Sequence, residues 1–87
     1  MPRLKLDLEA DDVRVLRGAL LAARATELAA VQRRDSRLVA GYGTDSARDD
    51  MTAEMAQHRR RIDLLDRLIE ALSAATEAHD RGTVQER

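Results

Sequence analysis

The stretch that decides the fold is MTAEMAQHRRRIDLLDRLIEALSAATEAH, residues 51–79. Its apolar residues and two histidines recur alternately four and three positions apart, which is the spacing of a coiled-coil seam sustained over about four heptads. The seam residues are Met51, Met55, His58, Ile62, Leu65, Ile69, Leu72, Thr76 and His79. The pattern predicts a helix over about 47–80 that packs lengthwise against another helix.

The partner helix is predicted just before this stretch. Apolar residues recur with helical spacing over about 8–39, and Asp7 is placed to cap that helix. Gly41 can take the left-handed conformation that ends a helix, and Thr44, Asp45 and Ser46 are each competent to cap the next one. We therefore predict an all-α, antiparallel two-helix hairpin: a single domain over 1–82 with its turn at 40–46. Gly82 is expected to end the second helix, and 83–87 to form a flexible tail.

Composition excludes several classes of protein. The chain has 87 residues, no Cys, a formal net charge of -1 and one aromatic residue, Tyr42. Without Cys there is no disulfide scaffold, Cys-ligated zinc site or thiol nucleophile. No apolar run approaches the ~18 residues of a membrane span, and no constellation of nucleophile, base and oxyanion donor can be assembled. We expect a non-enzymatic, cytoplasmic bacterial protein that carries no cofactor and no metal.

Charged residues at the edges of the seam favour one register. With the turn near residues 43–44, residue numbers that face each other across the hairpin add up to about 88. Arg17 then lies near Glu70, and Glu27 lies near Arg61. Arg24 is expected to pair with one of two acids, Asp63 or Asp66.

A lone hairpin leaves a second apolar line of each helix exposed to water. The candidate interaction residues of these lines are Leu21, Leu28, Leu64, Leu68, Ala71 and Ala75. We expect them to form one exposed apolar strip, and such strips usually mark a partner site. A homodimer that forms a four-helix bundle would cover the strip, and so would a dedicated protein partner.

Other candidate sites lie near the turn. His58 is expected to be a partly buried seam histidine with one hydrogen-bond partner. Arg33, Arg34, Arg37, Arg59, Arg60 and Arg61 form a possible basic patch, although nearby acids dilute the charge and make nucleic acid an unlikely partner. The acids Asp45, Asp49 and Asp50 favour helix capping over cation binding, and Tyr42 is expected to fold back over the end of the bundle more readily than to bind a partner.

The hairpin with acids at its tip resembles the coiled coils of the Gre and TraR/DksA-type regulators, which enter the secondary channel of bacterial RNA polymerase. About 40 residues carry the resemblance, from Asp45 through Ile69-Glu70-Ala71-Leu72 to Arg81-Gly82-Thr83. Arg48 stands where those families have a second acid, and neither a zinc module nor a Gre-type C-terminal domain is present. The chain is equally similar to small bacterial helical-hairpin proteins of unknown role.

The two readings imply different functions. The hairpin with an exposed apolar strip predicts an interaction or assembly module that acts through self-association or a protein partner. The resemblance implies, as the alternative, a transcription regulator that binds RNA polymerase through the tip residues Tyr42, Asp45, Asp49 and Asp50. No membrane partner is expected.

Overall fold

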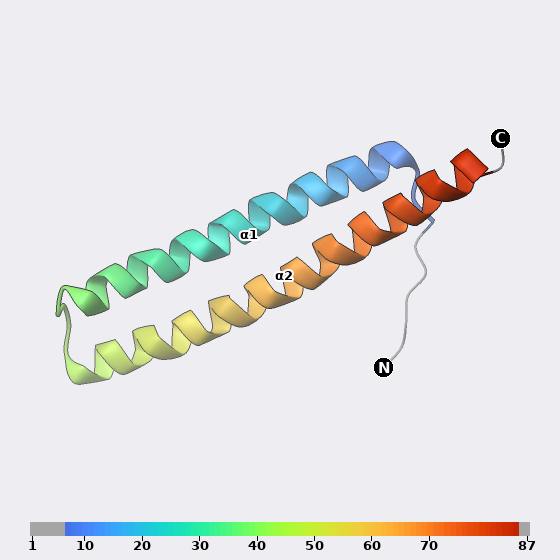
Figure 1. Ribbon diagram of the computed structural model, residues 1–87. Coiled ribbons are helices and arrows are strands. Elements are labelled where there is room, and N and C mark those ends of the chain that lie inside the picture. Colours follow the sequence, from blue (N-terminus) through green and yellow to red (C-terminus); the bar gives the residue numbers. More distant parts are fainter. Residues whose placement is uncertain (1–6, 86–87) are drawn as a thin grey trace.

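The computed structural model describes the backbone of residues 7–85 and the side chains of residues 7–78. The chain forms two helices, α1 (Ala10–Val39) and α2 (Asp45–Gln85), which run antiparallel as a hairpin (Figure 1). Its extents are 64 × 27 × 17 Å, and its radius of gyration is 18.5 Å. A compact domain of this length has a radius of gyration of about 12 Å, so the hairpin is a rod. The predicted all-α hairpin is confirmed.

The turn follows the predicted chemistry at the end of α1. Gly41 has φ 80°, and its N–H donates to the carbonyl of Leu38, while the N–H of Tyr42 donates to the carbonyl of Arg37. These two hydrogen bonds form a Schellman motif, which requires a left-handed residue and therefore favours glycine. The last carbonyls of α1 are thus satisfied within the turn itself.

The cap of α1 differs from the predicted one, whereas α2 is capped by Thr44, one of the three residues predicted to be able to cap it. α1 is capped by Glu9 in place of Asp7, and the carboxylate of Asp12 accepts the Glu9 backbone N–H at 3.1 Å. α2 begins at Asp45, because the Thr44 hydroxyl accepts the N–H of Ala47 at 3.2 Å. Several neighbouring residues can cap either helix, and local chemistry alone does not select one of them.

α2 continues through Gly82 to Gln85, beyond the helix end predicted at Gly82. A glycine inside a helix costs about 1 kcal/mol relative to alanine, which is too little to end a helix without a following proline or a competing cap. The tail predicted over 83–87 is therefore helical in its first three residues. Glu86 and Arg87 lie outside the described residues, as does the side chain of His79.

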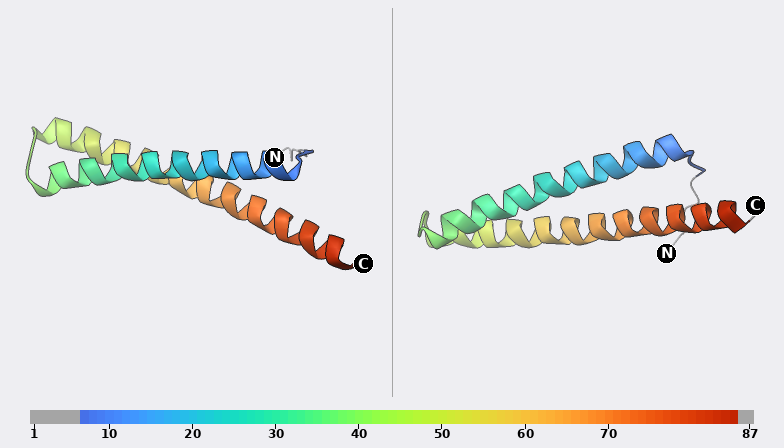
Figure 2. Two further views of the ribbon diagram at one scale, coloured as in Figure 1. Left: turned by 90° about the horizontal axis from the view of Figure 1, so that it is seen from above. Right: turned by 45° about the horizontal axis from the view of Figure 1, so that its top comes forward.

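The hairpin has two unequal parts. The tip half, residues 27–62, contains all four buried apolar residues found in the described part of the chain: Ala30, Val31, Met55 and Ile62. The open half, residues 10–26 and 63–78, contains none, and its seam leucines are only half-buried. Figure 2 shows the helices crossing and separating away from the turn. The core therefore lies near the turn, and the predicted seam residue Thr76 is exposed.

Candidate functional site

Ion pairs across the seam fix the register of the hairpin. Arg24 Nε lies 2.6 Å from Asp66 Oδ1, and Arg61 Nη1 lies 3.7 Å from Glu27 Oε1. Both predicted pairings are therefore present, and Asp66 is the partner that the structure selects for Arg24. A further pair joins Arg34 Nε to Glu54 Oε2 at 2.6 Å. The expected pair between Arg17 and Glu70 is absent from the described ion pairs, since the helices have begun to separate at that level.

His58 occupies the seam position predicted for it. Its Nδ1 is bonded to the carboxylate of Glu27, and the two side chains are only 18% and 20% exposed. The second oxygen of Glu27 faces Arg61, so a single carboxylate of α1 serves two residues of α2. A half-buried carboxylate needs such partners because burying an unpaired charge is costly. This cluster fixes the middle of the hairpin.

The ion pairs also divide the surface into two faces. Arg61 and Asp66 are five residues apart on α2, which places them about 140° apart around the helix, with the seam between them. On α2, Asp66 therefore lies along one edge of the seam, beside Arg24, and Arg61 lies along the opposite edge, from which it reaches Glu27 in the seam of α1. We call the first edge and its neighbours the charged face, and the second the alanine face.

The exposed leucines divide between these two faces. Leu21 and Leu28 lie three residues before and four after Arg24, so they belong to the charged face. Leu64 and Leu68 lie three and seven residues after Arg61, so they belong to the alanine face. All four are exposed, at 42%, 37%, 49% and 44% respectively. The expectation of exposed leucines is met, but the helical geometry separates them into two strips in place of the single one expected.

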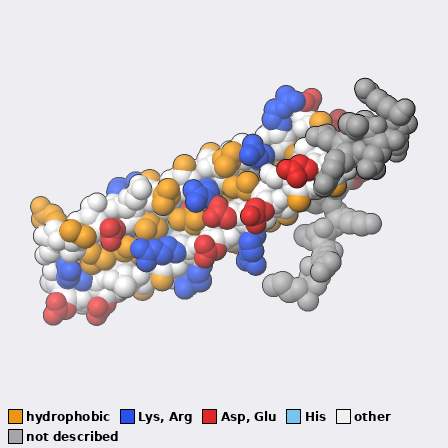
Figure 3. Space-filling model, viewed as in Figure 1, with side chains coloured by type: hydrophobic (Ala, Val, Ile, Leu, Met, Phe, Trp, Pro, Cys, Tyr) orange, Lys and Arg blue, Asp and Glu red, His pale blue; other side chains and the backbone are white. Residues whose placement is uncertain are grey.

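The two strips have different surroundings. Near Leu21 and Leu28, the charged face carries Arg24, Asp63 and Asp66. On the alanine face, the neighbours of Leu64 and Leu68 along α2 are Ala71 and Ala75, both exposed. The exposed residues that face them from α1 are Val15, Ala19, Ala22 and Thr26. Figure 3 shows one side of the rod, where acidic and basic groups alternate with hydrophobic side chains. On the alanine face, the charged residues lie at the borders of the strip: Arg60, Arg61 and Arg67 on α2, and Asp12 on α1.

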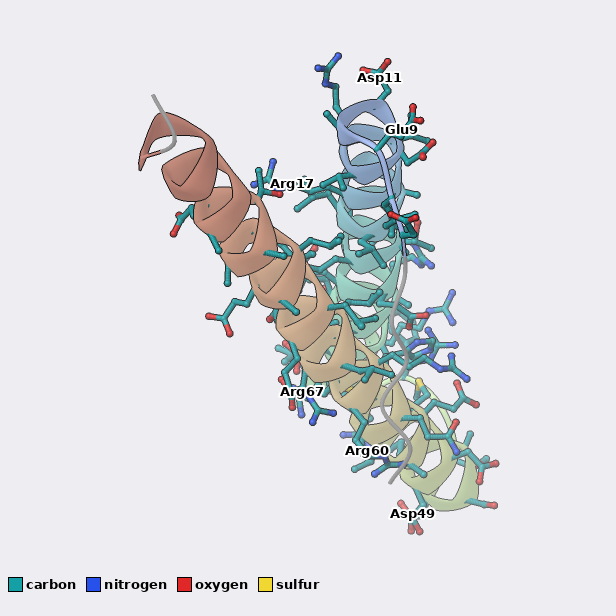
Figure 4. All side chains as sticks on the ribbon, turned by 90° about the vertical axis from the view of Figure 1, so that its right-hand side faces the viewer. Glu9, Asp11, Arg17, Asp49, Arg60 and Arg67 are labelled. Atoms are coloured by element: carbon teal, nitrogen blue, oxygen red, sulfur yellow. The ribbon has the colours of Figure 1, made fainter. Side chains whose placement is uncertain are left out.

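The candidate basic patch does not form one surface. Arg59, Arg60 and Arg61 are consecutive, so their side chains leave α2 in directions about 100° apart. Figure 4 shows Arg60 projecting from α2 and Arg67 projecting from the same helix two turns further along. Arg34 is paired with Glu54 and also donates to the carbonyl of Ala30 at 3.1 Å. Arg33 and Arg37 are exposed four residues apart on α1, so these two share one side of a helix.

The tip carries the candidate residues of the regulator alternative. Asp45, Asp49 and Asp50 are exposed, and Tyr42 is 68% exposed, so its ring does not cover the end of the hairpin. Figure 4 places Asp49 at the turn end of the rod, opposite the start of α1 marked by Glu9 and Asp11. Among the described side chains, no group of three or more His, Asp or Glu is placed to hold a metal ion.

Arg48 has a role that the sequence did not reveal. Its guanidinium donates to the carbonyl of Leu38 at 3.0 Å and to the carbonyl of Tyr42 at 3.3 Å. It thereby binds the first turns of α2 to the end of α1. The acceptors are backbone carbonyls, one in the last turn of α1 that also accepts the Gly41 N–H and one in the turn itself, so no charge pattern in the sequence points to them.

No family model, curated protein or solved structure matches the chain. The two-helix hairpin implied by the resemblance to the RNA polymerase regulators is present, but no match identifies a family. Neither described helix combines the length and apolarity needed to cross a membrane.

Proposed function

We propose that this hairpin is a non-enzymatic interaction module that acts by binding a protein surface, with self-association into a four-helix bundle as its main mode. The observation that carries the proposal is the set of four leucines exposed beside the seam, at 37–49% of their area. A packed rod with leucines on its outer surface is typical of a component that is completed by another chain.

The surface area of the rod supports the same proposal. The chain exposes 7344 Å², whereas a compact monomer of 9.7 kDa exposes about 5,100 Å². The excess of about 2,200 Å² is larger than the ~800 Å² that each partner buries in a standard interface. A chain that exposes this much surface to solvent can gain stability by burying part of it against another chain.

The alternative function is a transcription regulator that contacts RNA polymerase through the tip. The observation that favours it is the position of Arg48, whose guanidinium is turned onto the carbonyls of Leu38 and Tyr42. The carboxylates of Asp45, Asp49 and Asp50 therefore remain exposed beside Tyr42 with their negative charge uncompensated by Arg48. A pull-down of purified RNA polymerase tests this alternative, with Asp49→Asn and Asp50→Asn as the variants expected to abolish retention.

The main proposal is tested by comparing the wild-type chain with a variant in which all four exposed leucines are replaced by Asp. Sedimentation equilibrium gives the mass of each in solution, and affinity capture from cell extract gives any bound protein. We expect the wild type to bind a second copy or a defined protein, and the variant to bind neither while keeping its helical circular dichroism. A wild type that is monomeric and captures nothing that the variant loses would refute the proposal.

A further inference from the structure

We infer that the alanine face is the surface through which two copies of this chain associate, with their tips at the same end of the bundle. The inference rests on the proposed function and specifies its surface, its occupant and its geometry. Three features carry it: the placement of charge, the alternation of large and small side chains, and a pair of complementary charged groups near the tip.

The placement of charge selects the alanine face over the charged face. The alanine-face residues that a neighbouring chain would cover are apolar or small, apart from the hydroxyl of Thr26. Arg60, Arg61 and Arg67 border them on α2 and Asp12 borders them on α1, and the long arginine side chains can keep their charged ends in water. On the charged face, a neighbouring chain would have to cover the Arg24–Asp66 pair, whose side chains are 38% and 46% exposed. Removing such a pair from water costs more than its attraction returns.

Large and small side chains on the alanine face are arranged to fit a second copy. Residues facing across the hairpin add up to about 88, so Leu68 is level with the gap between Ala19 and Ala22 on α1. Leu64 is level with the gap between Ala22 and Thr26. A two-fold axis along the length of the rod places α2 of one copy over α1 of the other. Each leucine then enters a gap between small residues, as a knob enters a hole.

The same two-fold rotation places α1 of one copy over the small residues of α2 of the other copy. Val15, which is 73% exposed, is level with the gap between Ala71 and Ala75. Both helices of each copy therefore offer protruding residues to gaps on the other copy. The face is complementary to itself, which is the requirement for an isologous two-fold interface.

Charges near the tip favour the same orientation. On the alanine face, α1 carries the exposed cations Arg33 and Arg37, and α2 carries the exposed acids Asp50 and Glu54, of which Glu54 also pairs with Arg34 of its own chain. Arg33 is level with Glu54, and Arg37 is level with Asp50. With both tips at one end, the basic segment of each copy lies over the acidic segment of the other. With the tips at opposite ends, these charges would lie over the apolar open half and would lose water without gaining a partner.

The experiment uses two single variants with matched starting exposure. Leu68→Asp changes the alanine face at a leucine that is 44% exposed, and Leu21→Asp changes the charged face at one that is 42% exposed. We expect the wild type to sediment at twice its 9.7 kDa mass, Leu68→Asp to weaken dimerisation at least a hundredfold, and Leu21→Asp to weaken it less than threefold. Circular dichroism of both variants controls for folding.

The orientation is measured with one spin label. The chain has no cysteine, so Ser46→Cys, at an exposed position near the tip, provides a single attachment point. Tips at the same end give a label-to-label distance below about 30 Å, because neighbouring helices of a bundle lie 8–10 Å apart. Tips at opposite ends give about 60 Å, since 1.5 Å per residue separates each tip from the middle of the alanine face.

Each other outcome overturns a stated part of the inference. If Leu21→Asp weakens dimerisation more than Leu68→Asp does, the interface lies on the charged face and the inference is wrong. A label-to-label distance of about 60 Å refutes the proposed orientation of the tips. A wild type that remains monomeric at 100 µM, on the order of usual assay concentrations, refutes self-association. None of these results alone removes the proposed function, which fails only if no protein binds through the exposed leucines.

Discussion

The tip half and the open half of this hairpin are built from the same two helices, yet they are stabilised differently. The tip half contains Met55 and Ile62 at 4% and 9% exposure, the shared carboxylate of Glu27, and the Arg48 hydrogen bonds to the turn. The open half has one ion pair across the seam and leucines on its outer surface. The tip half is therefore largely complete within one chain, whereas the open half is the part that the proposed association would complete.

The largest effect is expected from removing a buried side chain in the tip half. Ile62→Ala leaves a cavity beside Val31 and Met55 and should lower the free energy of unfolding by about 2–4 kcal/mol. Leu72→Ala, in the open half, removes a side chain that is only half-buried and should cost about half as much in the monomer. Urea unfolding at low protein concentration measures both. Equal losses would contradict the unequal distribution of the core.

A smaller effect is expected at the turn. Arg48→Ala removes two hydrogen bonds to the carbonyls of Leu38 and Tyr42 and should lower the free energy of unfolding by about 1–2 kcal/mol. Arg60→Ala is the matched control, because Arg60 is exposed and its substitution should change stability by less than about 0.5 kcal/mol. Thermal unfolding of the two variants compares them directly. If both behave alike, Arg48 does not bind α2 to the end of α1.

Much of this comparison was accessible from the sequence. The heptad spacing from Met51 to Leu72 predicted the seam of α2, and Gly41 predicted the end of α1, because each depends on local periodicity or backbone conformation. The register followed from the position of the turn. The choice of Asp66 over Asp63 did not follow, since the two lie less than one turn apart and both are near Arg24 in a straight-helix construction.

The division of the leucines into two faces was not predicted, and the reason lies in α1. Polar residues occupy its seam at Arg24, Glu27 and Arg34, while Leu21 and Leu28 lie outside it. The apolar pattern of α1 therefore does not identify the side that faces α2. Only the ion pairs, which depend on tertiary structure, show to which edge of the seam each leucine belongs.

The smallest expected effect is the coupling energy of the ion pair across the open half, and it tests the register there. A double-mutant cycle between Arg24 and Asp66 should give a coupling energy of about 0.2–1 kcal/mol, which is typical of pairs that are largely exposed. The corresponding cycle between Arg24 and Asp63 should give nearly zero. Denaturant unfolding at low salt provides the four stabilities of each cycle. A larger coupling energy with Asp63 than with Asp66 would mean that α1 and α2 pack in a register about one helical turn away from the one described.

Amide hydrogen exchange as a function of protein concentration tests the central claim most directly. If association completes the open half, the backbone amides of residues 64–78 gain protection as the dimer forms, while those near Met55 and Ile62 are already protected in the monomer. Leu68→Asp should remove the concentration dependence and leave the protection of the tip half unchanged. Protection that is uniform along α2 and independent of concentration would contradict the account.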